Sequence, residues 1–533
     1  MDAIHNDRPV ALALLLAAAL LVCLGAVALV AAAPASAGPT ADPPGSTAGL
    51  DALLALQQAQ LTAADGAANA QFGYSVAISG DTAAVGVPND DVGGNTDQGS
   101  AYVFVRNGTT WSQQQKLTAG DGAANDNFGF SVAISGDTVV VGAHFDDVGA
   151  NTNQGSAYVF VRSGTTWSQQ QKLLAVPVGA NCEFGYSVAL SGETAVVGTP
   201  GSLVSAHTNQ GSAFVFVRIS GLWLQQAQLT ADDGAANDLL GRSVAIDGDT
   251  AVVGADRADV GANTDQGSAY VFLRNGSTWI FQRKLTAADG AAWDNLGCSV
   301  AISGDIAVLG ACGGEVGANT DQGSAYVFTR SGITWTEQQK LTAIDGAAYD
   351  DFGISVAISG DTAVVSADCD SVGANAGQGS AYVFARSGST WSQQAKLTAA
   401  DGATDDEFGY SVSTSSTTAV VGAAFNDVGA VADQGSAYVF VVGTPGRPTA
   451  KAPKGLISSR TPTFKWTAAA GAATYEVRVY KGSTLLKKKT GITKTSWRCT
   501  KRLPRMVWLT WKVRASNAAG AGPWSAKPRF KVR

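Results

Sequence analysis

The stretch FGYSVAISGDTAAVGV, residues 72–87, decides the fold because it recurs along the chain. A second stretch, DQGSAYVFVR at residues 97–106, recurs in phase with it. Two patterns that share one period over seven copies indicate a repeat architecture, in which each copy is one supersecondary unit. The Phe-Gly or Leu-Gly pair begins at residues 72, 128, 184, 240, 296, 352 and 408, always 56 residues after the previous one.

Each copy is predicted to contain four short β-strands. The inner three are almost continuously apolar, as is typical of strands that are covered on both faces. The Gly80-Asp81 pair suits a two-residue turn whose first position favours Gly, and Asn107-Gly108 suits the turn before the fourth strand. In the first copy the predicted strands are residues 74–79, 82–87, 99–106 and 111–118.

The fourth strand of each copy alternates in polarity. Trp111, Gln113, Gln115 and Leu117 are expected to lie on one of its faces. Buried inner strands and a wetter outer strand are typical of a propeller blade, which packs between two neighbours. Seven copies therefore predict an all-β fold with a seven-bladed β-propeller. The repeated Trp is expected to pack between blades rather than to form a sugar-binding surface.

The ring is predicted to close through a strand from the N-terminal side. The seventh copy lacks a fourth strand, whereas LQQAQLT at residues 56–62 matches the fourth strand of the other copies. We expect this segment to complete the last blade, because closure removes two exposed sheet edges. The propeller is predicted to cover residues 51–445.

These copies resemble FG-GAP repeats, which occur in the heads of integrin α-subunits and, in a closer form, in bacterial proteins. The resemblance rests on FGISVAISGDTAVVSA at residues 352–367 and on the QGSAYVF that follows it. It implies a secreted or cell-surface propeller used for binding and adhesion. Integrin-type repeats carry calcium loops between the first two strands. A tight Gly-Asp turn stands there in this chain, so that calcium site does not carry over.

Acidic loops gather on one face of the predicted propeller. This face holds the loop before the first strand and the loop between the second and third strands of each blade. Oxygen-bearing side chains with Gly suit a hard cation such as calcium. The alternative is that Asp, Asn and Gly serve only as turn formers. The candidate calcium ligands are Asp91, Asn95, Asp97, Asp147, Asn151, Asp259, Asn263, Asp265 and Asp321.

Sequence signatures of catalysis are missing. His144 and His207 occupy different repeat positions, and no G-x-S-x-G, H-E-x-x-H or phosphate-binding loop is present. We therefore predict that the chain is not an enzyme and that it binds an extracellular protein or glycan. A passive envelope component and a polysaccharide-active propeller enzyme are the alternatives, since a fold does not determine a function.

The composition changes abruptly at residue 446. Residues 446–533 contain 21 Lys and Arg and one acidic residue, whereas the rest of the chain contains 15 basic and 42 acidic residues. TPTFKWTAAAGAATYEVRVY at 461–480 and WLTWKVRASNAAGAGPWS at 508–525 resemble a fibronectin type III module. This resemblance implies a small β-sandwich.

Such a basic module is expected to attract polyanions, among them anionic cell-wall polymers. Lys487, Lys488 and Lys489 form its densest run of charge. The alternative is that this run is only a solvated hairpin turn. A dedicated nucleic-acid site is not predicted.

Residues 1–37 are predicted to be a signal peptide. An uncharged apolar run over residues 10–33 precedes Pro34-Ala35-Ser36-Ala37, which resembles a cleavage site. The alternative is a retained anchor, because the run is long enough to span a bilayer. The protein is therefore expected to be secreted or held at the cell surface. Residues 38–50 would then be a linker, and no transmembrane segment would remain after signal removal.

Cysteines are not expected to provide a disulfide framework. The five that remain after signal removal do not share a repeat position. Cys298 and Cys312 flank one predicted hairpin, so they are expected either to face each other or to remain two half-buried thiols.

Overall fold

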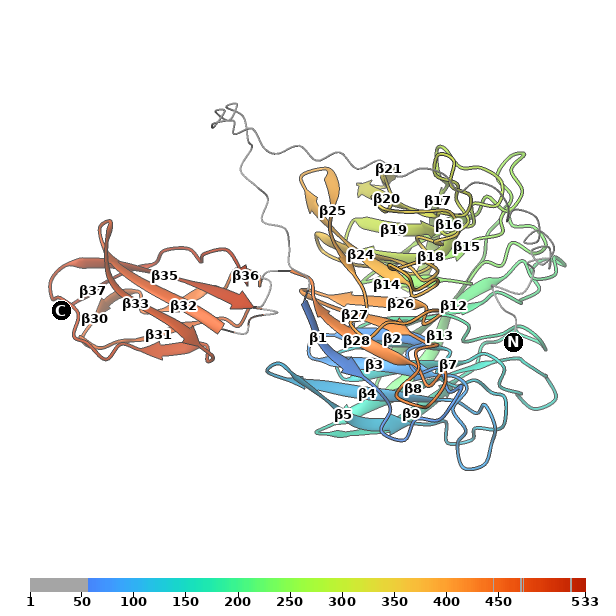
Figure 1. Cartoon of the computed structure of the whole chain (residues 1–533), viewed down its shortest axis with the longest axis horizontal. Coiled ribbons are helices and arrows are strands. Elements are labelled where there is room, and N and C mark those ends of the chain that lie inside the picture. Colours follow the sequence, from blue (N-terminus) through green and yellow to red (C-terminus); the bar gives the residue numbers. More distant parts are fainter. Residues whose placement is uncertain (1–55, 444, 470–471, 473, 518–519) are drawn as a thin grey trace, which may run out of the picture. The chain divides into compact units, whose positions relative to one another are not determined.

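The computed structural model describes residues 56–443, 445–469, 472, 474–517 and 520–533 (Figure 1). These residues form strands and turns and contain no helix, so the described chain is all-β. Accordingly, this part of the chain has no helix long and apolar enough to cross a membrane. The predicted signal peptide and linker lie outside the described residues.

Seven four-stranded antiparallel sheets form the blades of a β-propeller. The first blade consists of β2, β3, β4 and β5, in that order from the axis outwards. Two-residue turns and longer loops connect them alternately. The bounds of these strands are β2 (Ser75–Ser79), β3 (Thr82–Val87), β4 (Ser100–Asn107) and β5 (Thr110–Leu117).

The other blades repeat this order. The second contains β6 (Ser131–Ser135), β7 (Thr138–Ala143), β8 (Ser156–Ser163) and β9 (Thr166–Leu173). The third contains β10 (Val188–Ser191), β11 (Thr194–Thr199), β12 (Ser212–Ile219) and β13 (Leu222–Leu229). The fourth contains β14 (Val244–Asp247), β15 (Thr250–Ala255), β16 (Ser268–Asn275) and β17 (Thr278–Leu285). The fifth contains β18 (Leu296–Ser303), β19 (Ile306–Ala311), β20 (Ser324–Ser331) and β21 (Thr334–Leu341). The sixth contains β22 (Val356–Ser359), β23 (Thr362–Ala367), β24 (Ser380–Ser387) and β25 (Thr390–Leu397), and the seventh begins with β26 (Phe408–Ser415), β27 (Thr418–Ala423) and β28 (Ser436–Val441).

The strand β1 (Leu56–Leu61) completes the seventh blade by pairing antiparallel with β28, as the sequence predicts (Figure 1). Trp111 of the first blade donates from Nε1 to Gln58 Oε1 on β1 at 3.0 Å. The same bond joins Trp167 of the second blade to Gln114 of the first, at 2.8 Å. β1 therefore makes to the next blade the contact that the other fourth strands make.

A β-bulge in the fourth strand corrects the predicted alternation. In β5 the register shifts after Gln113, so that Gln114 is the extra residue. Gln115 and Leu117 therefore lie on the opposite face from Trp111, and not on its face as predicted. The bulge turns Gln114 towards the indole of the next blade. The repeated Trp residues thus pack between blades, as expected, but through a different geometry.

Most hairpin turns of the blades place Gly where the backbone requires a positive φ, while Ser220 and Ser416 hold that position in the third and seventh blades. Between β2 and β3, Gly80 has a φ of +60° at the first of two turn positions, as predicted. Between β4 and β5, Asn107 pairs with Thr110, so the turn residues are Gly108 and Thr109 instead of the predicted Asn107-Gly108. The reason is that the positive φ, +67° at Gly108, falls on the first turn position.

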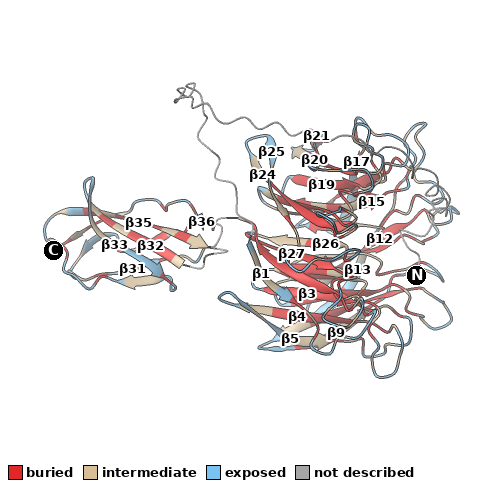
Figure 2. Cartoon of the chain, in the orientation of Figure 1, coloured by how far each residue is buried: buried red, intermediate tan, exposed pale blue. Residues whose placement is uncertain are grey.

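The hydrophobic cores lie between neighbouring blades. Val103 of the first blade shares one core with Val139, Phe160 and Trp167 of the second. Figure 2 shows the buried residues concentrated along the inner strands, while the fourth strands are half-buried or exposed. Each sheet therefore buries both faces, which explains its continuous apolar sequence.

The second strand of each blade approaches the segment that enters the innermost strand of the next blade so closely that a side chain does not fit between them. A Cβ atom on Gly86 would overlap the carbonyl oxygen of Gly129 in the next blade. Gly129 has a φ of +99°, a conformation that favours Gly. The Ser75 hydroxyl donates to the same Gly129 oxygen at 2.8 Å. This junction explains why the Phe-Gly pair and the Gly of the second strand recur.

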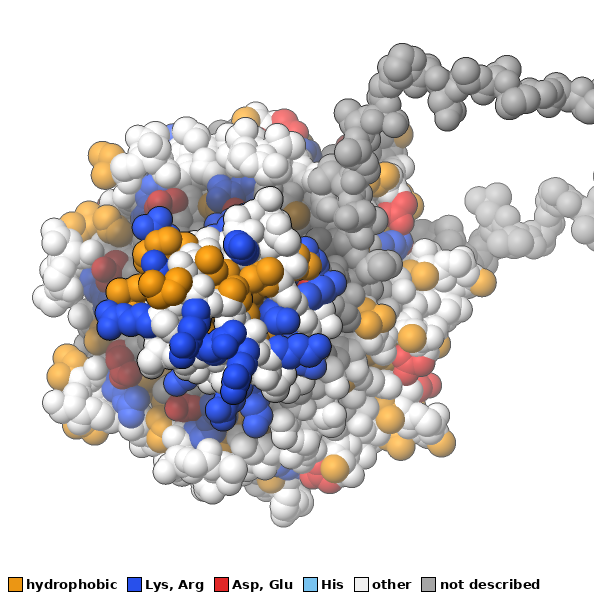
Figure 3. Space-filling model, turned by 90° about the vertical axis from the view of Figure 1, so that its left-hand side faces the viewer, with side chains coloured by type: hydrophobic (Ala, Val, Ile, Leu, Met, Phe, Trp, Pro, Cys, Tyr) orange, Lys and Arg blue, Asp and Glu red, His pale blue; other side chains and the backbone are white. Residues whose placement is uncertain are grey.

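The C-terminal residues form two sheets around one core, which is a small β-sandwich. Phe464, Val477, Trp511 and Phe530 are among its buried residues. Figure 3 shows Lys and Arg side chains crowding this module. The fibronectin type III resemblance stays a prediction. One sheet contains β29 (Ala450–Ala452), β31 (Thr463–Trp466) and β34 (Ser496–Arg498), and the other β30 (Gly455–Ile457), β32 (Thr474–Lys481), β33 (Thr484–Ile492), β35 (Trp508–Asn517), β36 (Gly520–Ala521) and β37 (Arg529–Val532).

Substitutions in β1 test whether this strand holds the ring closed. Leu61 is 3% exposed in the core that joins the seventh and first blades, whereas Leu56 on the same strand is 53% exposed. Leu61→Ala is expected to lower the free energy of unfolding by about 2–5 kcal/mol, because it leaves a cavity in that core. Leu56→Ala is the control and should cost less than about 0.5 kcal/mol. Urea unfolding of both variants measures the difference, and equal small effects would contradict closure through β1.

Candidate functional site

Two positions of every blade depart from the repeat. The first is the residue after each Phe-Gly or Leu-Gly pair, and the second is the residue directly after the second strand. We call these residues the axial cluster. Its first positions are Tyr74, Phe130, Tyr186, Arg242, Cys298, Ile354 and Tyr410, and its second positions are Pro88, His144, Pro200, Asp256, Cys312, Asp368 and Ala424.

First-position side chains of successive blades touch each other. The Tyr74 ring lies 4.9 Å from Phe130 and 4.7 Å from Tyr410, centroid to centroid. Phe130 lies 4.9 Å from Tyr186 of the third blade. Side chains separated by 56 residues meet in this way because the innermost strands converge on the axis. One side of the axial cluster is therefore a continuous aromatic surface.

His144 is buried within this aromatic side. It is 4% exposed, and its ring lies 3.8 Å from the rings of both Phe130 and Phe145. Burial lowers the pKa of His144 to about 3, so the imidazole is neutral at ordinary pH. Its Nδ1 has no hydrogen-bond partner among the described residues.

Charged and sulfur-bearing side chains occupy the adjoining part of the axial cluster. Arg242 Nε lies 3.4 Å from Asp256 Oδ2, and this carboxylate raises the pKa of Arg242. Cys298 and Cys312 are neighbours and are also two half-buried free thiols, so the structure has features of both expectations and no disulfide between them. The hydrogen bond with Cys298, together with burial, raises the pKa of Cys312 well above its ordinary value.

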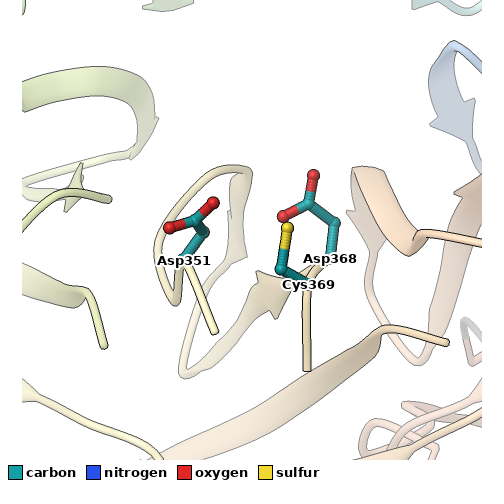
Figure 4. A group of neighbouring side chains, drawn as sticks. All are labelled: Asp351, Asp368 and Cys369. Carbon is teal, nitrogen blue, oxygen red and sulfur yellow. The ribbon is translucent and has the colours of Figure 1, made fainter. Parts of the chain in front are cut away.

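Acidic groups meet at the sixth and seventh blades. Ligand atoms of Asp351, Asp368 and Cys369 all lie within 4.8 Å of one another (Figure 4). Burial and the carboxylates of Asp351 and Glu407 raise the pKa of Asp368 well above its ordinary value. Burial and the neighbouring carboxylates of Asp405 and Asp351 also raise the pKa of Glu407, to about 7.

Several buried polar atoms of the axial cluster and of the neighbouring Glu407 lack a hydrogen-bond partner. They are His144 Nδ1, Asp256 Oδ1, Asp368 Oδ1 and Glu407 Oε2, four of nine such atoms among the described residues. Each costs free energy in the folded state, because water is lost without replacement. Residues that reduce the stability of the fold and that do not recur in every blade are typical of a functional site.

The predicted calcium ligands support their own loops. Asp91 Oδ1 accepts from the amide of Asp97 at 3.0 Å, and Asp259 accepts from Asp265 in the same way. Asn95 Nδ2 donates to a carbonyl oxygen of the following loop at 3.1 Å. These bonds suit turn formers, and calcium binding stays a prediction. Equivalent positions are held by Asp147, Asn151, Asn263 and Asp321.

The repeated Asp residues of the loops before the first strands form ion pairs. Lys116 Nζ lies 2.8 Å from Asp65 and 2.7 Å from the buried Asp90. Tyr102 donates to Asp65 at 2.7 Å. This arrangement braces the loop against the outer strands of its own blade, which gives these repeated acids a structural role.

Apart from Cys298 and Cys312, the residues of the axial cluster are the ones that the sequence interpretation misses. Motif searches find residues that recur or lie close together in sequence, whereas these residues differ between blades and lie 56 residues apart. The available signal is departure from the repeat at a position that faces the axis. His144 in place of the Asp or Pro of other blades is one instance.

Lys487, Lys488 and Lys489 lie in the strand β33 at the edge of the larger C-terminal sheet. The hairpin-turn alternative is therefore wrong for this run. Lys487 is half-buried, while Lys488 and Lys489 are exposed. Lys residues on an edge strand also discourage pairing with other chains, which gives the run a structural interpretation beside polyanion binding.

Comparison with known proteins identifies the repeats. The FG-GAP repeat family model matches more than half of the chain. A search of curated proteins finds no match. Among solved structures, the chain is similar to the Pseudomonas aeruginosa periplasmic gluconolactonase PpgL, with 14% identity over 62% of this chain and 86% of that chain and a TM-score of 0.40. The family matches cover residues 56–104, 111–160, 167–216, 223–272, 279–328, 335–384 and 391–440.

The gluconolactonase corrects the prediction that the chain is not an enzyme. A protein named for an enzymatic activity is among the structures that match, so missing motifs do not exclude catalysis. The physical reason is that motifs detect residues adjacent in sequence, whereas a site at the axis draws residues from several blades. With 14% identity and a TM-score of 0.40, this likeness transfers neither a reaction nor a residue.

The raised pKa of Glu407 predicts a specific pH dependence of stability. An unfolded Glu has a pKa of about 4.3, so the folded chain, with a value of about 7, holds this proton more tightly. Stability from this group therefore increases as the pH falls from 8 to 5. Glu407→Gln should be more stable than the wild type by on the order of 3 kcal/mol at pH 8, and the difference should shrink as the pH falls through about 7 and vanish only near pH 4, below the unfolded pKa.

Denaturant unfolding in the presence of a chelator, at several pH values, measures this difference. Glu315→Gln changes an exposed carboxylate of the fifth blade and is the control. A stability difference between Glu407→Gln and the wild type that does not change with pH would contradict the proposed protonation.

Proposed function

Because the chain belongs to the FG-GAP repeat family, we propose that it is an exported binding or adhesion protein whose propeller presents the axial cluster to an extracellular ligand. The family match supports the propeller, and the apolar run at residues 10–33 supports export. The observation that carries the proposal is that three residues of the axial cluster, together with Glu407, hold four of the nine unpartnered buried polar atoms among the described residues.

The chemistry of the axial cluster favours a carbohydrate. The rings of Tyr410, Tyr74 and Phe130 provide an apolar surface on which the C–H face of a sugar ring can stack. The unpartnered carboxylate oxygens of Asp368 and Glu407 are acceptors for sugar hydroxyl groups. An apolar surface beside a few converging polar groups is the usual composition of a small-ligand site.

A glycan array with the full chain tests this proposal. We expect saturable binding to one glycan class, and Tyr74→Ala should weaken it at least tenfold because it removes a central ring of the aromatic surface. Trp293→Ala is the matched control, since Trp293 is a 60% exposed ring in a loop before β18 and outside the axial cluster. Equal glycan binding by the wild type, Tyr74→Ala and Trp293→Ala would contradict the proposal. Binding only to protein ligands would also contradict it. Product analysis of the bound glycan shows whether turnover accompanies binding.

A second function is favoured by the outer face of the C-terminal sheet. Arg478, Lys512 and Arg514 lie 4.8, 4.1 and 4.6 Å from the Trp524 ring centroid. Each points away from the core, because the alternate residues of β32 and β35 are buried. Cations that lie over a ring keep their charge and are held in place. Together they form a positive surface of fixed geometry.

Only one carboxylate balances this surface. Glu476 is buried beneath it and accepts hydrogen bonds from Arg478 at 2.7 Å and from Arg514 at 2.8 Å. Despite burial, these bonds lower the pKa of Glu476, so it stays ionised. The remaining charge is available to a partner. We propose that this face binds an anionic polysaccharide of the cell wall, with the cations pairing to its carboxylate or phosphate groups.

Heparin chromatography of the full chain tests the second function, with heparin as the anionic polysaccharide. The double variant Arg478→Gln and Lys512→Gln should elute at clearly lower salt than the wild type. The control is Lys501→Gln with Arg502→Gln, which makes the same charge change in exposed residues outside this sheet. An equal loss in both double variants would indicate a net-charge effect and contradict a defined face. Preferential binding to DNA over heparin would contradict the choice of polysaccharide.

A further inference from the structure

Three potential metal ligands meet at the axial end of the sixth blade. Asp368 and Cys369 directly follow β23, and Asp351 directly precedes the Phe352-Gly353 pair. Their ligand atoms lie within 4.8 Å of one another, and Figure 4 shows the Asp368 carboxylate beside the Cys369 sulfur with the Asp351 carboxylate next to them. Among the described residues, no other group of three acidic, Cys or His side chains is this close.

The combination is confined to one blade. The residues equivalent to Cys369 in the other blades are Asn, Phe, Gly, Arg, Gly and Phe, and those equivalent to Asp368 include Pro, His and Ala. The propeller fold therefore does not require these three side chains. A donor set that a repeat acquires once, against its own pattern, needs a separate explanation.

Asp368 provides an independent indication that the site takes a ligand. Its side chain is 2% exposed, and Oδ1 has no hydrogen-bond partner among the described residues. A buried carboxylate in this position is costly unless a proton or a metal ion neutralises it.

We propose that Asp351, Asp368 and Cys369 bind one divalent metal ion of intermediate softness, for which Zn²⁺ is the best match. A proton would neutralise Asp368 but would leave its buried oxygen without a partner, whereas a metal ion would coordinate that oxygen directly. The thiolate disfavours Mg²⁺ and Ca²⁺, which prefer oxygen ligands. Zn²⁺ accepts both thiolate and carboxylate ligands.

Three protein ligands leave a tetrahedral Zn²⁺ one open position. Zinc sites with an open position bind water or substrate there, while closed sites with four protein ligands are structural. Glu407 of the seventh blade lies close enough to influence the charge of Asp368. The metal site shares Asp368 with the axial cluster but does not depend on the glycan proposal.

Metal analysis of the full chain tests the proposal with Zn²⁺ alone. After treatment with chelator and dialysis against Zn²⁺, the wild type should retain one Zn²⁺ per chain, and Zn²⁺ should raise its melting temperature. Co²⁺ in place of Zn²⁺ should give a thiolate-to-metal charge-transfer absorption. Cys369→Ser should abolish that absorption and weaken Zn²⁺ binding at least tenfold.

Matched variants separate this site from other thiols. Cys182→Ser removes a buried thiol of the third blade, and Cys298→Ser removes one from the fifth, so both should retain Zn²⁺ and the absorption. Asp368→Asn should lose Zn²⁺ yet be at least as stable as the metal-free wild type, because it removes the buried charge. This second variant shows that loss of metal is not loss of folding.

Two outcomes would overturn the inference. The first is a wild type that binds no Zn²⁺ at one per chain. The second is binding that survives Cys369→Ser but is lost in Cys298→Ser, which would place the metal at another thiol. Because no glycan is present in these measurements, either result leaves the glycan-binding proposal to its own test.

Discussion

The close approach of the second strand of each blade to the segment that enters the next blade's innermost strand is the contact on which the ring depends. The Gly86 backbone lies against the Gly129 carbonyl, and the Ser75 hydroxyl bonds to the same oxygen. Without side chains in the way, seven sheets can converge to one axis. At the outer edge, the Trp and bulged Gln pairs hold neighbouring blades together, and Arg162 reaches back to Thr82 of the preceding blade at 3.1 Å. Inner and outer contacts together set the angle between blades.

One junction departs from this rule, and it adjoins the proposed metal site. In the sixth blade Ser366 replaces Gly, so a Cβ atom on Gly409 of the seventh blade would lie 3.0 Å from the Ser366 Cβ, and Gly409 has a φ of +111°. The Ser355 hydroxyl there accepts from the Val412 amide at 3.0 Å, rather than donating to the Gly409 carbonyl as its counterparts do. Asp368 and Cys369 come directly after this altered strand segment, so the sixth blade departs from the repeat in both backbone contact and side-chain chemistry.

The repeated contacts leave the axial cluster free to vary. Each blade is held by its own cores, ion pairs and Trp–Gln bonds, so first- and second-position residues are not needed for folding. Unpartnered buried groups such as His144 Nδ1 and Asp368 Oδ1 reduce stability, but the many equivalent cores around the ring offset that cost. The residues that stabilise the fold are therefore different from the axial residues that we propose bind a ligand.

The sequence alone determined the number of blades, the order of their strands and the closing role of β1, because periodicity and polarity are local properties that survive without coordinates. It also determined the charge of the C-terminal module. It did not determine the bulge at Gln114. The alternation of polar and apolar residues along one strand does not reveal where that strand has an extra residue relative to the strand it pairs with. The tertiary structure alone decided which side chains meet at the axis. Tyr74 and Tyr410 are more than 300 residues apart, and only a closed ring places their centroids 4.7 Å from each other. Asp351, Asp368 and Cys369 become neighbours within the sixth blade, because its antiparallel β22–β23 hairpin brings the residues before β22 and the residues after β23 to the same end.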